Sequence, residues 1–309
     1  MLKRLFCDLR LPYTIELLGP TLIKSGVETV VGPDMVFVTT AGRGSSDAPE
    51  IYLPGTSLKG VVRSHAERIV RTLAKTQPGV CAPYDREKTS PDQCCNSRFN
   101  WKASTPRTTI YSQACLACRL FGALGFAGRV AISDAYLTQD SKVVRELRDG
   151  VAIDRKSGGA AAGAKFEFEV AVSGKFAGTI ELTNFESWQV GLLGVVLRDL
   201  ESERLRIGMG ASRGFGHVRA SFGDVELRYP APFDDGTFRG IERMASQGER
   251  KAYELLCGTA QAPALAAATA DGLFRVRRMP WADFGRFVDF GIEEFGTVVS
   301  NDPWPGARP

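Results

Sequence analysis

Apolar side chains recur along the first 225 residues with the two periods of regular secondary structure. Residues 11–24 (LPYTIELLGPTLIK) predict a strand that breaks at Gly19-Pro20. The segment that follows residue 50 predicts a short apolar strand, a Pro-Gly turn and a helix capped by Thr56 or Ser57. On this helix the apolar residues recur three and four apart, and we expect them to face the core: Leu58, Val62, Ala66, Ile69 and Leu73.

The next segments predict further strands and a second helix. Residues 129–138 predict a strand, and residues 165–172 (KFEFEVAV) predict a hairpin with the TIEL segment beyond the SGKFAG turn. Residues 186–200 predict an amphipathic helix, and the last strand ends near Phe222. The order strand, helix, strand, strand, helix, strand is typical of ferredoxin-like folds. We therefore expect an α+β protein with a modified ferredoxin-like sheet of the RNA-recognition type.

Insertions and an extension are expected around this sheet. Residues 76–120 contain a segment rich in Pro, Asp, Ser and Thr without apolar periodicity, and residues 151–184 begin with a Gly- and Ala-rich loop. Beyond residue 225 the pattern predicts one helix around 238–257 and then a short basic strand, LFRVRRM. The sequence therefore predicts a core at 1–225 that carries both insertions, followed by a C-terminal extension at 226–309.

Composition places the chain among globular proteins. Of its 309 residues, 44% are hydrophobic and 24% are charged, which is enough apolar surface for one large core. No apolar run reaches the ~18 residues that a membrane-spanning helix needs. Asp8 and Arg10 interrupt the first apolar segment, so it does not resemble a secretory signal. We therefore expect a cytoplasmic protein without a membrane partner.

The formal charge of +4 is too small to indicate nucleic-acid binding by itself. Its distribution is more informative, because five Lys or Arg residues and one Glu lie between Lys59 and Lys75. A second basic segment, residues 204–219, holds four arginines. Basic patches of this kind suit a phosphate backbone, although solvated helix and turn surfaces also explain them.

Clustered cysteines predict a metal site. The chain has seven cysteines, and an odd number in a cytoplasmic protein argues against a disulfide framework. Cys115 and Cys118 have the two-residue gap that lets both thiolates bind one tetrahedral ion. We predict a structural zinc site from Cys81, Cys94, Cys115 and Cys118, with Cys95 as the alternative to its neighbour. Buried thiols and a redox Cys-x-x-Cys pair remain the competing interpretations.

The segment RIGMGASRGFGHV, residues 206–218, is rich in glycine. Glycines let backbone amides approach a phosphate closely, and Arg213 and His217 add side-chain donors. A Walker loop is excluded because no Gly-Lys-Ser/Thr follows. A dinucleotide-binding fingerprint is excluded because the loop follows a helix and precedes a strand. A simple tight turn remains the alternative to a phosphate-binding loop.

Four motifs together resemble the repeat-associated mysterious protein (RAMP) superfamily, and specifically the backbone subunits of type III and type III-derived CRISPR effector complexes. The motifs are YLPGTSLKGVVRSHAE, CLACRLFGALGFAGRVAISDA, VAIDRKSGGAAAGAKFEFEV and RIGMGASRGFGHV, in this order. The resemblance implies a modified RNA-recognition fold. It also implies that several copies stack along one guide RNA, so the expected partners are guide RNA, target RNA, further copies of the chain and other effector subunits.

The resemblance assigns RNA contacts to residues in three motifs. It places Lys59 and Arg63 on guide phosphates, at the start of the first helix. It makes residues 153–164 a thumb-like hairpin loop that wedges between guide and target. The remaining RNA contacts that it implies are Asp154, Arg155 and Lys156 in this loop, and Arg213 and His217 in the glycine-rich segment.

Some relatives cleave target RNA with an aspartate in the loop after the first strand, and Asp34 is the best match here. Such a carboxylate would bind Mg²⁺ or another divalent ion, or position the RNA 2′-hydroxyl. The chain departs from the relatives' Asp-x-Pro pattern, and Asp47 is a second candidate. The alternatives are a non-catalytic scaffold that relies on a separate nuclease, and a stand-alone repeat-processing ribonuclease. Such ribonucleases usually use histidine, and the chain has only His65 and His217.

Overall fold

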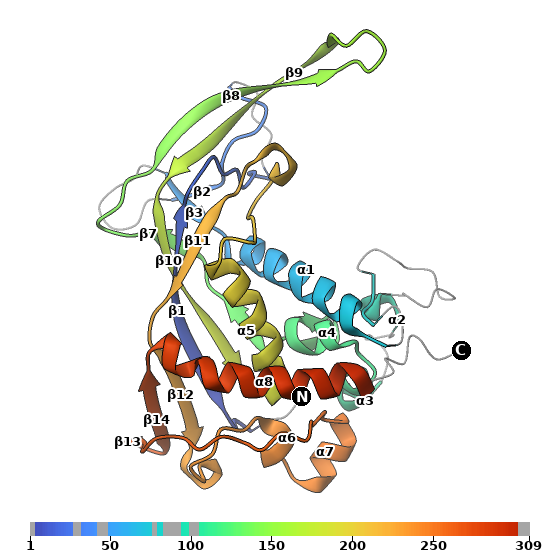
Figure 1. Cartoon of the computed structure of the whole chain (residues 1–309), viewed down its shortest axis with the longest axis vertical. Coiled ribbons are helices and arrows are strands. Elements are labelled where there is room, and N and C mark those ends of the chain that lie inside the picture. The colour runs from blue at the N-terminus through green and yellow to red at the C-terminus, as the bar shows by residue number, and fades with distance from the viewer. Residues whose placement is uncertain are drawn as a thin grey trace.

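The computed structural model describes residues 4–26, 32–41, 49–75, 79–82, 94–98 and 105–301. An antiparallel sheet runs the length of the body, and helices cover one of its faces (Figure 1). The strands of this sheet within the described residues are β1 (Asp8–Leu17), β2 (Thr39–Thr40), β3 (Glu50–Leu53), β6 (Val130–Ile132), β7 (Ala135–Leu137), β10 (Lys175–Thr183), β11 (Val218–Phe222), β12 (Val225–Pro230), β13 (Thr269–Asp271) and β14 (Phe274–Met279).

Three long helices pack on the sheet, and shorter ones surround them. The long helices are α1 (Gly55–Leu73), α5 (Ser187–Glu201) and α8 (Trp281–Asn301). The short ones are α2 (Cys95–Arg98), α3 (Arg107–Ser112), α4 (Leu116–Phe121), α6 (Ile241–Met244) and α7 (Gln247–Tyr253), with 3-10 turns at Ala211–Arg213 and Ala231–Phe233. No helix among the described residues is both long and apolar enough to span a bilayer.

The centre of the sheet has the strand order expected of a ferredoxin-like fold. β1 pairs with β11 on one side and with β10 on the other, and β10 in turn pairs with β6 and β7. Along β1 the side chains alternate between buried and more exposed, as the pleat of a strand requires. The predicted α+β class is therefore confirmed, and the sheet is antiparallel.

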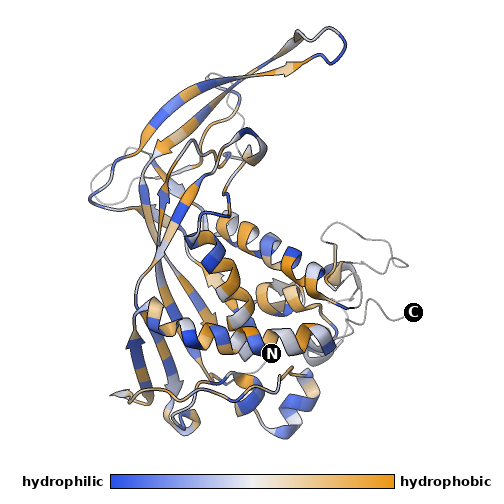
Figure 2. Cartoon of the chain, in the orientation of Figure 1, coloured by the Kyte–Doolittle hydropathy of each residue, from blue (hydrophilic) through white to orange (hydrophobic). Residues whose placement is uncertain are grey.

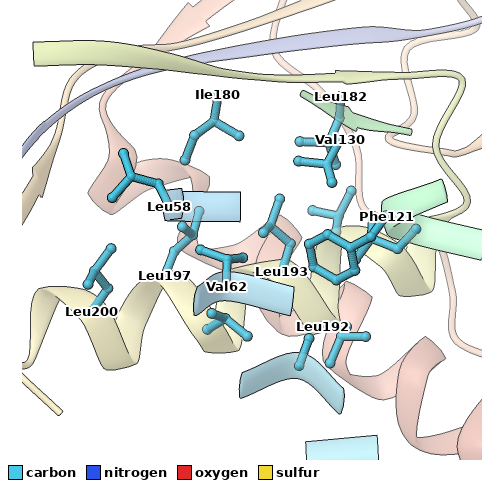
Figure 3. Packing of buried hydrophobic residues seen from close by; sticks show 14 of the residues in the cluster. Leu58, Val62, Phe121, Val130, Ile180, Leu182, Leu192, Leu193, Leu197 and Leu200 are labelled. Atoms are coloured by element: carbon cyan, nitrogen blue, oxygen red, sulfur yellow. The ribbon is translucent and has the colours of Figure 1, made fainter. Parts of the chain in front are cut away.

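The main core lies between the sheet and the helices. Figure 3 shows Leu58 and Val62 of α1 meeting Leu193 and Leu197 of α5 beneath Ile180 of β10. Burying a leucine or valine side chain of this kind stabilises the fold by about 1.5–3 kcal/mol. One predicted core position of α1 is wrong: Leu73 is 52% exposed, because it lies in the last turn, where the helix ends.

A long hairpin leaves the body at one end of the sheet (Figure 1). It consists of β8 (Val144–Ile153) and β9 (Ala160–Ser173), which pair with each other from Val144 to Ile153. Hydrophobic and hydrophilic residues alternate along it (Figure 2). The predicted hairpin between residues 165–172 and the TIEL segment is wrong, because TIEL lies in β10, which pairs with β1.

The C-terminal residues continue both layers of the body. β12, β14 and β13 extend the sheet beyond β1, and α8 lies across α5. The two helices approach most closely at Gly191 and Gly291, where a Cβ on Gly191 would lie 2.0 Å from the Gly291 carbonyl carbon. The single helix predicted around 238–257 is instead two short helices, α6 and α7, separated at Ala245 and Ser246.

Candidate functional site

Four buried cysteines gather beside α1. The Sγ atoms of Cys81, Cys95, Cys115 and Cys118 all lie within 4.8 Å of one another. The Cys81 sulfur is 3.7 Å from those of Cys115 and Cys118. Tetrahedral zinc with Zn–S bonds of about 2.3 Å separates its sulfur ligands by about 3.8 Å, so the group has the size of a zinc site. The predicted choice of Cys94 is corrected, because its neighbour Cys95 joins the group.

Backbone N–H groups at the start of α4 donate hydrogen bonds to two of these sulfurs. Cys115 is the N-cap of α4, and its Sγ accepts a hydrogen bond from the Cys118 N–H at 3.5 Å. The Cys115 N–H in turn donates to the Cys95 Sγ, also at 3.5 Å. Burial raises the pKa of the Cys115 thiol, but side-chain hydrogen bonds with Cys118, Cys81 and Cys95 outweigh it and hold this pKa well below its ordinary value, while the bond with Cys115 raises the pKa of Cys118 and of Cys95. Thiolate character is what metal binding requires.

The two basic residues predicted at the start of α1 both donate hydrogen bonds within the protein. The Lys59 Nζ donates to the Val130 carbonyl at 3.0 Å, and burial together with the nearby Arg63 lowers the Lys59 pKa. The Arg63 guanidinium reaches the Cys118 Sγ at 3.3 Å. The expected cap by Thr56 or Ser57 is wrong, because the helix begins at Gly55, whose N–H is bound by a carboxylate oxygen of Asp134.

A basic groove of about 560 Å³ lies on another side of α1, against the glycine-rich segment. Its polar lining from α1 is Ser57, Ser64, His65 and Arg68, and its lining from the segment after α5 includes Arg204 and Arg206. Arg68 has no acidic partner among the described residues. These arginines belong to the two basic segments of the sequence, but no motif assigns them a role. Their shared groove joins residues more than 130 positions apart, which spacing alone does not reveal.

A carboxylate beneath the groove orients part of its lining. Asp199 binds the His65 Nε2 at 2.8 Å and accepts a hydrogen bond from the Arg204 guanidinium at 3.0 Å. Burial raises the pKa of Asp199, but these two hydrogen bonds outweigh it and leave the Asp199 pKa below its ordinary value. Arg204 is thereby held at the rim of the groove while most of its side chain stays exposed.

The glycine-rich segment folds as a compact turn whose backbone only glycine allows. Gly208, Gly210, Gly214 and Gly216 all have positive φ angles, and a Cβ on Gly216 would lie 2.0 Å from the Ile207 carbonyl oxygen. The two predicted contact residues of this segment are both engaged. Arg213 stacks over the Phe166 ring of β9 at 5.3 Å, and the His217 Nε2 lies 2.9 Å from Glu203.

The tip of the β8–β9 hairpin is organised by Asp154. Its carboxylate accepts hydrogen bonds from the backbone N–H groups of Lys156 and Ser157 and from the Ser157 hydroxyl, and these bonds lower the Asp154 pKa. Arg155 and Lys156 are exposed beside it, without an acidic partner among the described residues. Asp154 therefore shapes the turn, and its two basic neighbours are free to contact a ligand.

Asp34 lies beside the middle of the same hairpin. It is exposed, and its carboxylate accepts a hydrogen bond of 2.8 Å from the Glu167 N–H of β9. Asp47, the second candidate, lies outside the described residues. In the described part of the chain, the cysteines form the only close group of three or more metal-ligating side chains, so no second metal site supports Asp34.

Arginines on the helix-free face of the sheet differ from those of the groove. Arg10 pairs with Glu181 at 3.8 Å, Arg228 with Asp8 at 3.0 Å, and Arg278 with Glu226 at 2.7 Å. These three positive charges are therefore balanced across neighbouring strands. Exposed pairs of this kind contribute at most about 1 kcal/mol to stability, and they leave little net field for an anionic ligand.

Comparison with known proteins identifies the family of the chain. A search of curated proteins finds no match to the chain. The sequence model of the RAMP superfamily matches residues 14–219, a span that runs from β1 to β11 and includes the groove, the cysteine group and the hairpin. This span is well over half of the chain. The chain belongs to the RAMP superfamily.

Proposed function

We propose that this chain is a guide-RNA-binding backbone subunit of a type III or type III-derived CRISPR effector complex, which presents the guide to target RNA in antiviral defence. Membership of the RAMP superfamily supports the association with CRISPR RNA. The observation that carries the finer proposal is the basic groove between α1 and the glycine-rich segment, because it concentrates positive charge that no carboxylate nearby neutralises in full.

The groove suits the sugar-phosphate backbone of a single RNA strand. Arg68, Arg204 and Arg206 supply positive charge, and Ser57 and Ser64 supply hydroxyl donors. The described residues that line the groove include no Phe, Tyr or Trp on which a base could stack. Binding should therefore be nearly independent of guide sequence and should weaken as salt concentration rises. Lys59 would add a phosphate contact at the start of the same helix, because its ammonium has three donors and the Val130 carbonyl occupies one.

The hairpin gives the proposed subunit a second contact with nucleic acid. It projects from the body (Figure 1), and its tip presents Arg155 and Lys156. We propose that it acts as the thumb that wedges between guide and target strands. Arg213 would position this arm rather than bind RNA directly, because its guanidinium lies on the Phe166 ring in the middle of the hairpin. A metal in the cysteine group would supply structural stability and no chemistry.

Guide binding by variants of the groove tests the proposal. We expect Arg68→Gln and Arg206→Gln each to weaken binding of a guide RNA about 5–50-fold and to reduce the salt slope by about 0.7 per lost phosphate contact. Arg278→Gln is the matched control, because that arginine is already paired with Glu226 on the open face of the sheet. Equal effects of all three substitutions would show that the groove is not the guide site.

Target-RNA cleavage by Asp34 is the second candidate function. The position of Asp34 beside the middle of the proposed thumb favours it, since a displaced target nucleotide would lie near this carboxylate. We expect Asp34→Asn to abolish cleavage in the reconstituted complex with magnesium, because the amide keeps an acceptor for the Glu167 N–H and loses the charge. Glu167→Gln, on the adjacent strand, should cut normally. Unchanged cleavage by Asp34→Asn would make the chain a scaffold and place the chemistry in another residue or subunit.

A further inference from the structure

One stripe of α1 faces the cysteine group rather than the groove. Arg63, Glu67 and Arg71 lie four residues apart and therefore follow one side of the helix. The Arg63 guanidinium donates to the Cys118 Sγ at 3.3 Å and to the Gly122 carbonyl at 3.3 Å. Arg71 donates to the Cys81 carbonyl at 3.1 Å. Each arginine thus contacts a segment that carries a cysteine of the group.

Glu67 holds both arginines in this orientation. Its carboxylate accepts a hydrogen bond of 2.8 Å from the Arg63 Nε and lies 3.6 Å from the Arg71 guanidinium. The Glu67 side chain is only 7% exposed, and a carboxylate so deeply buried is stable only when it is paired. The three side chains therefore form one network between α1 and the cysteines. We call this network, Arg63, Glu67 and Arg71, the arginine clamp.

Charge explains why such a clamp is needed. Four thiolates around one divalent cation carry a net charge of about −2, and burying that charge without compensation is costly. The four cysteines are buried, and Arg63 is the cation whose guanidinium reaches one of their sulfurs in the described part of the chain. A hydrogen bond from a cation to a ligating sulfur also draws electron density from it and fixes its position.

We infer that Arg63 is an outer-shell residue of a Cys81–Cys95–Cys115–Cys118 zinc site, oriented by Glu67, and that its main role is to stabilise the metal centre rather than to bind guide phosphate. Its Nε, Nη1 and Nη2 atoms all have partners within the protein. A bidentate phosphate contact would have to break at least one of these bonds. Arg68, one turn further along and on the groove side, has no such commitments among the described residues.

The pair Arg63 and Arg68 allows a double test on the purified full chain. Zinc affinity is measured by competition with a chromophoric chelator, and guide-RNA affinity is measured at saturating zinc. We expect Arg63→Gln to lower zinc affinity about 10–100-fold and to change RNA affinity less than about threefold. Arg68→Gln should leave zinc affinity unchanged. The zinc result does not depend on the proposed RNA function, so the two inferences can fail separately.

Arg63→Lys keeps the test decisive if the Gln variant folds poorly. A lysine retains the charge but cannot reach Glu67, Gly122 and Cys118 together, so we expect a smaller loss of zinc affinity, about 3–10-fold. Cobalt substitution provides an independent readout, because the thiolate-to-cobalt absorption bands should weaken or shift in both Arg63 variants. Wild-type zinc affinity in both variants would overturn the inference, as would a loss of RNA binding at saturating zinc equal to that of Arg68→Gln.

Discussion

At the scale of single residues, the spacing of the cysteines indicates a metal site but does not show which cysteines form it. Cys94 and Cys95 are adjacent and both buried, yet only Cys95 places its sulfur with those of Cys115 and Cys118. Cys95 begins α2, and its Sγ accepts the Cys115 N–H, whereas Cys94 precedes the helix. The side chains of neighbouring residues project in different directions, so the residue at which α2 begins decides whether Cys94 or Cys95 faces the group. The sequence does not predict this residue, because the insertion has few apolar positions.

Serine substitutions distinguish the two cysteines. We expect Cys95→Ser to lower zinc affinity about 100-fold, because each thiolate supplies roughly a quarter of a binding free energy of about 10–16 kcal/mol. Cys94→Ser should bind one zinc per chain with unchanged affinity. Metal content by mass spectrometry and chelator competition measure both. The opposite pattern would show that Cys94 is the ligand.

Glu242 provides a pH-dependent contribution to stability. This residue lies in α6, is buried against the start of α5, and accepts hydrogen bonds from the Ser187 hydroxyl and N–H. Burial raises its pKa to about 7. The folded pKa exceeds the unfolded value, so the folded state binds the extra proton. This stabilisation is complete below about pH 4.3 and is lost as pH rises to about 7.

We therefore expect the free energy of unfolding to fall by about 2–3 kcal/mol between pH 5 and pH 7.5 through this one group. Glu242→Gln should remove that part of the slope, since an amide does not titrate. Urea denaturation of both proteins across the pH range measures the difference. Parallel stability curves for wild type and variant would contradict this assignment.

At the scale of elements, the apolar patterns locate segments better than they identify partners. The helices at Gly55–Leu73 and Ser187–Glu201 and the break after β1 agree with the predictions, because each depends on local periodicity or on a Gly-Pro pair. Alternation in residues 165–172 correctly indicates a strand. It does not reveal β8 as the partner, since Val144, Leu147 and Val151 recur three and four residues apart rather than every second residue.

The crossing of α5 and α8 depends on glycine. Gly191→Ala would place a Cβ 2.0 Å from the Gly291 backbone, so we expect a loss of about 1–3 kcal/mol in unfolding free energy as the helices move apart. Gly296→Ala, in α8 with open space around it, is the control. It should be neutral or stabilise the protein by up to about 1 kcal/mol. Equal effects of both substitutions, measured by chemical denaturation, would show that the crossing tolerates separation.

At the scale of the whole molecule, the functional surfaces arise from contacts between distant segments. The groove joins α1 to residues near 204–208, and the arginine clamp joins the same helix to the cysteine group. The sequence predicted a basic helix, a glycine-rich turn and a metal site separately. It could not predict which side of α1 faces which partner, because helical spacing defines a stripe but not its neighbour.

The C-terminal residues belong to the same body. Glu294 of α8 is 1% exposed and accepts the N–H groups of Gly258 and Ala260, and Glu186 at the start of α5 accepts that of Leu256. Two buried carboxylates thus fasten the segment before β13 to the helical layer. We propose that residues 226–301 support the core that carries the groove, as part of one folded unit.

The most direct test of the proposed function is the number of chains that bind one RNA. Native mass spectrometry of the chain with unstructured RNAs of increasing length would measure it. A backbone subunit predicts several copies per RNA, with the number rising in regular steps with length and independently of sequence, and falling sharply in the Arg68→Gln and Arg206→Gln double variant. A single copy on RNAs of every length, or binding that needs one particular sequence, would contradict the account.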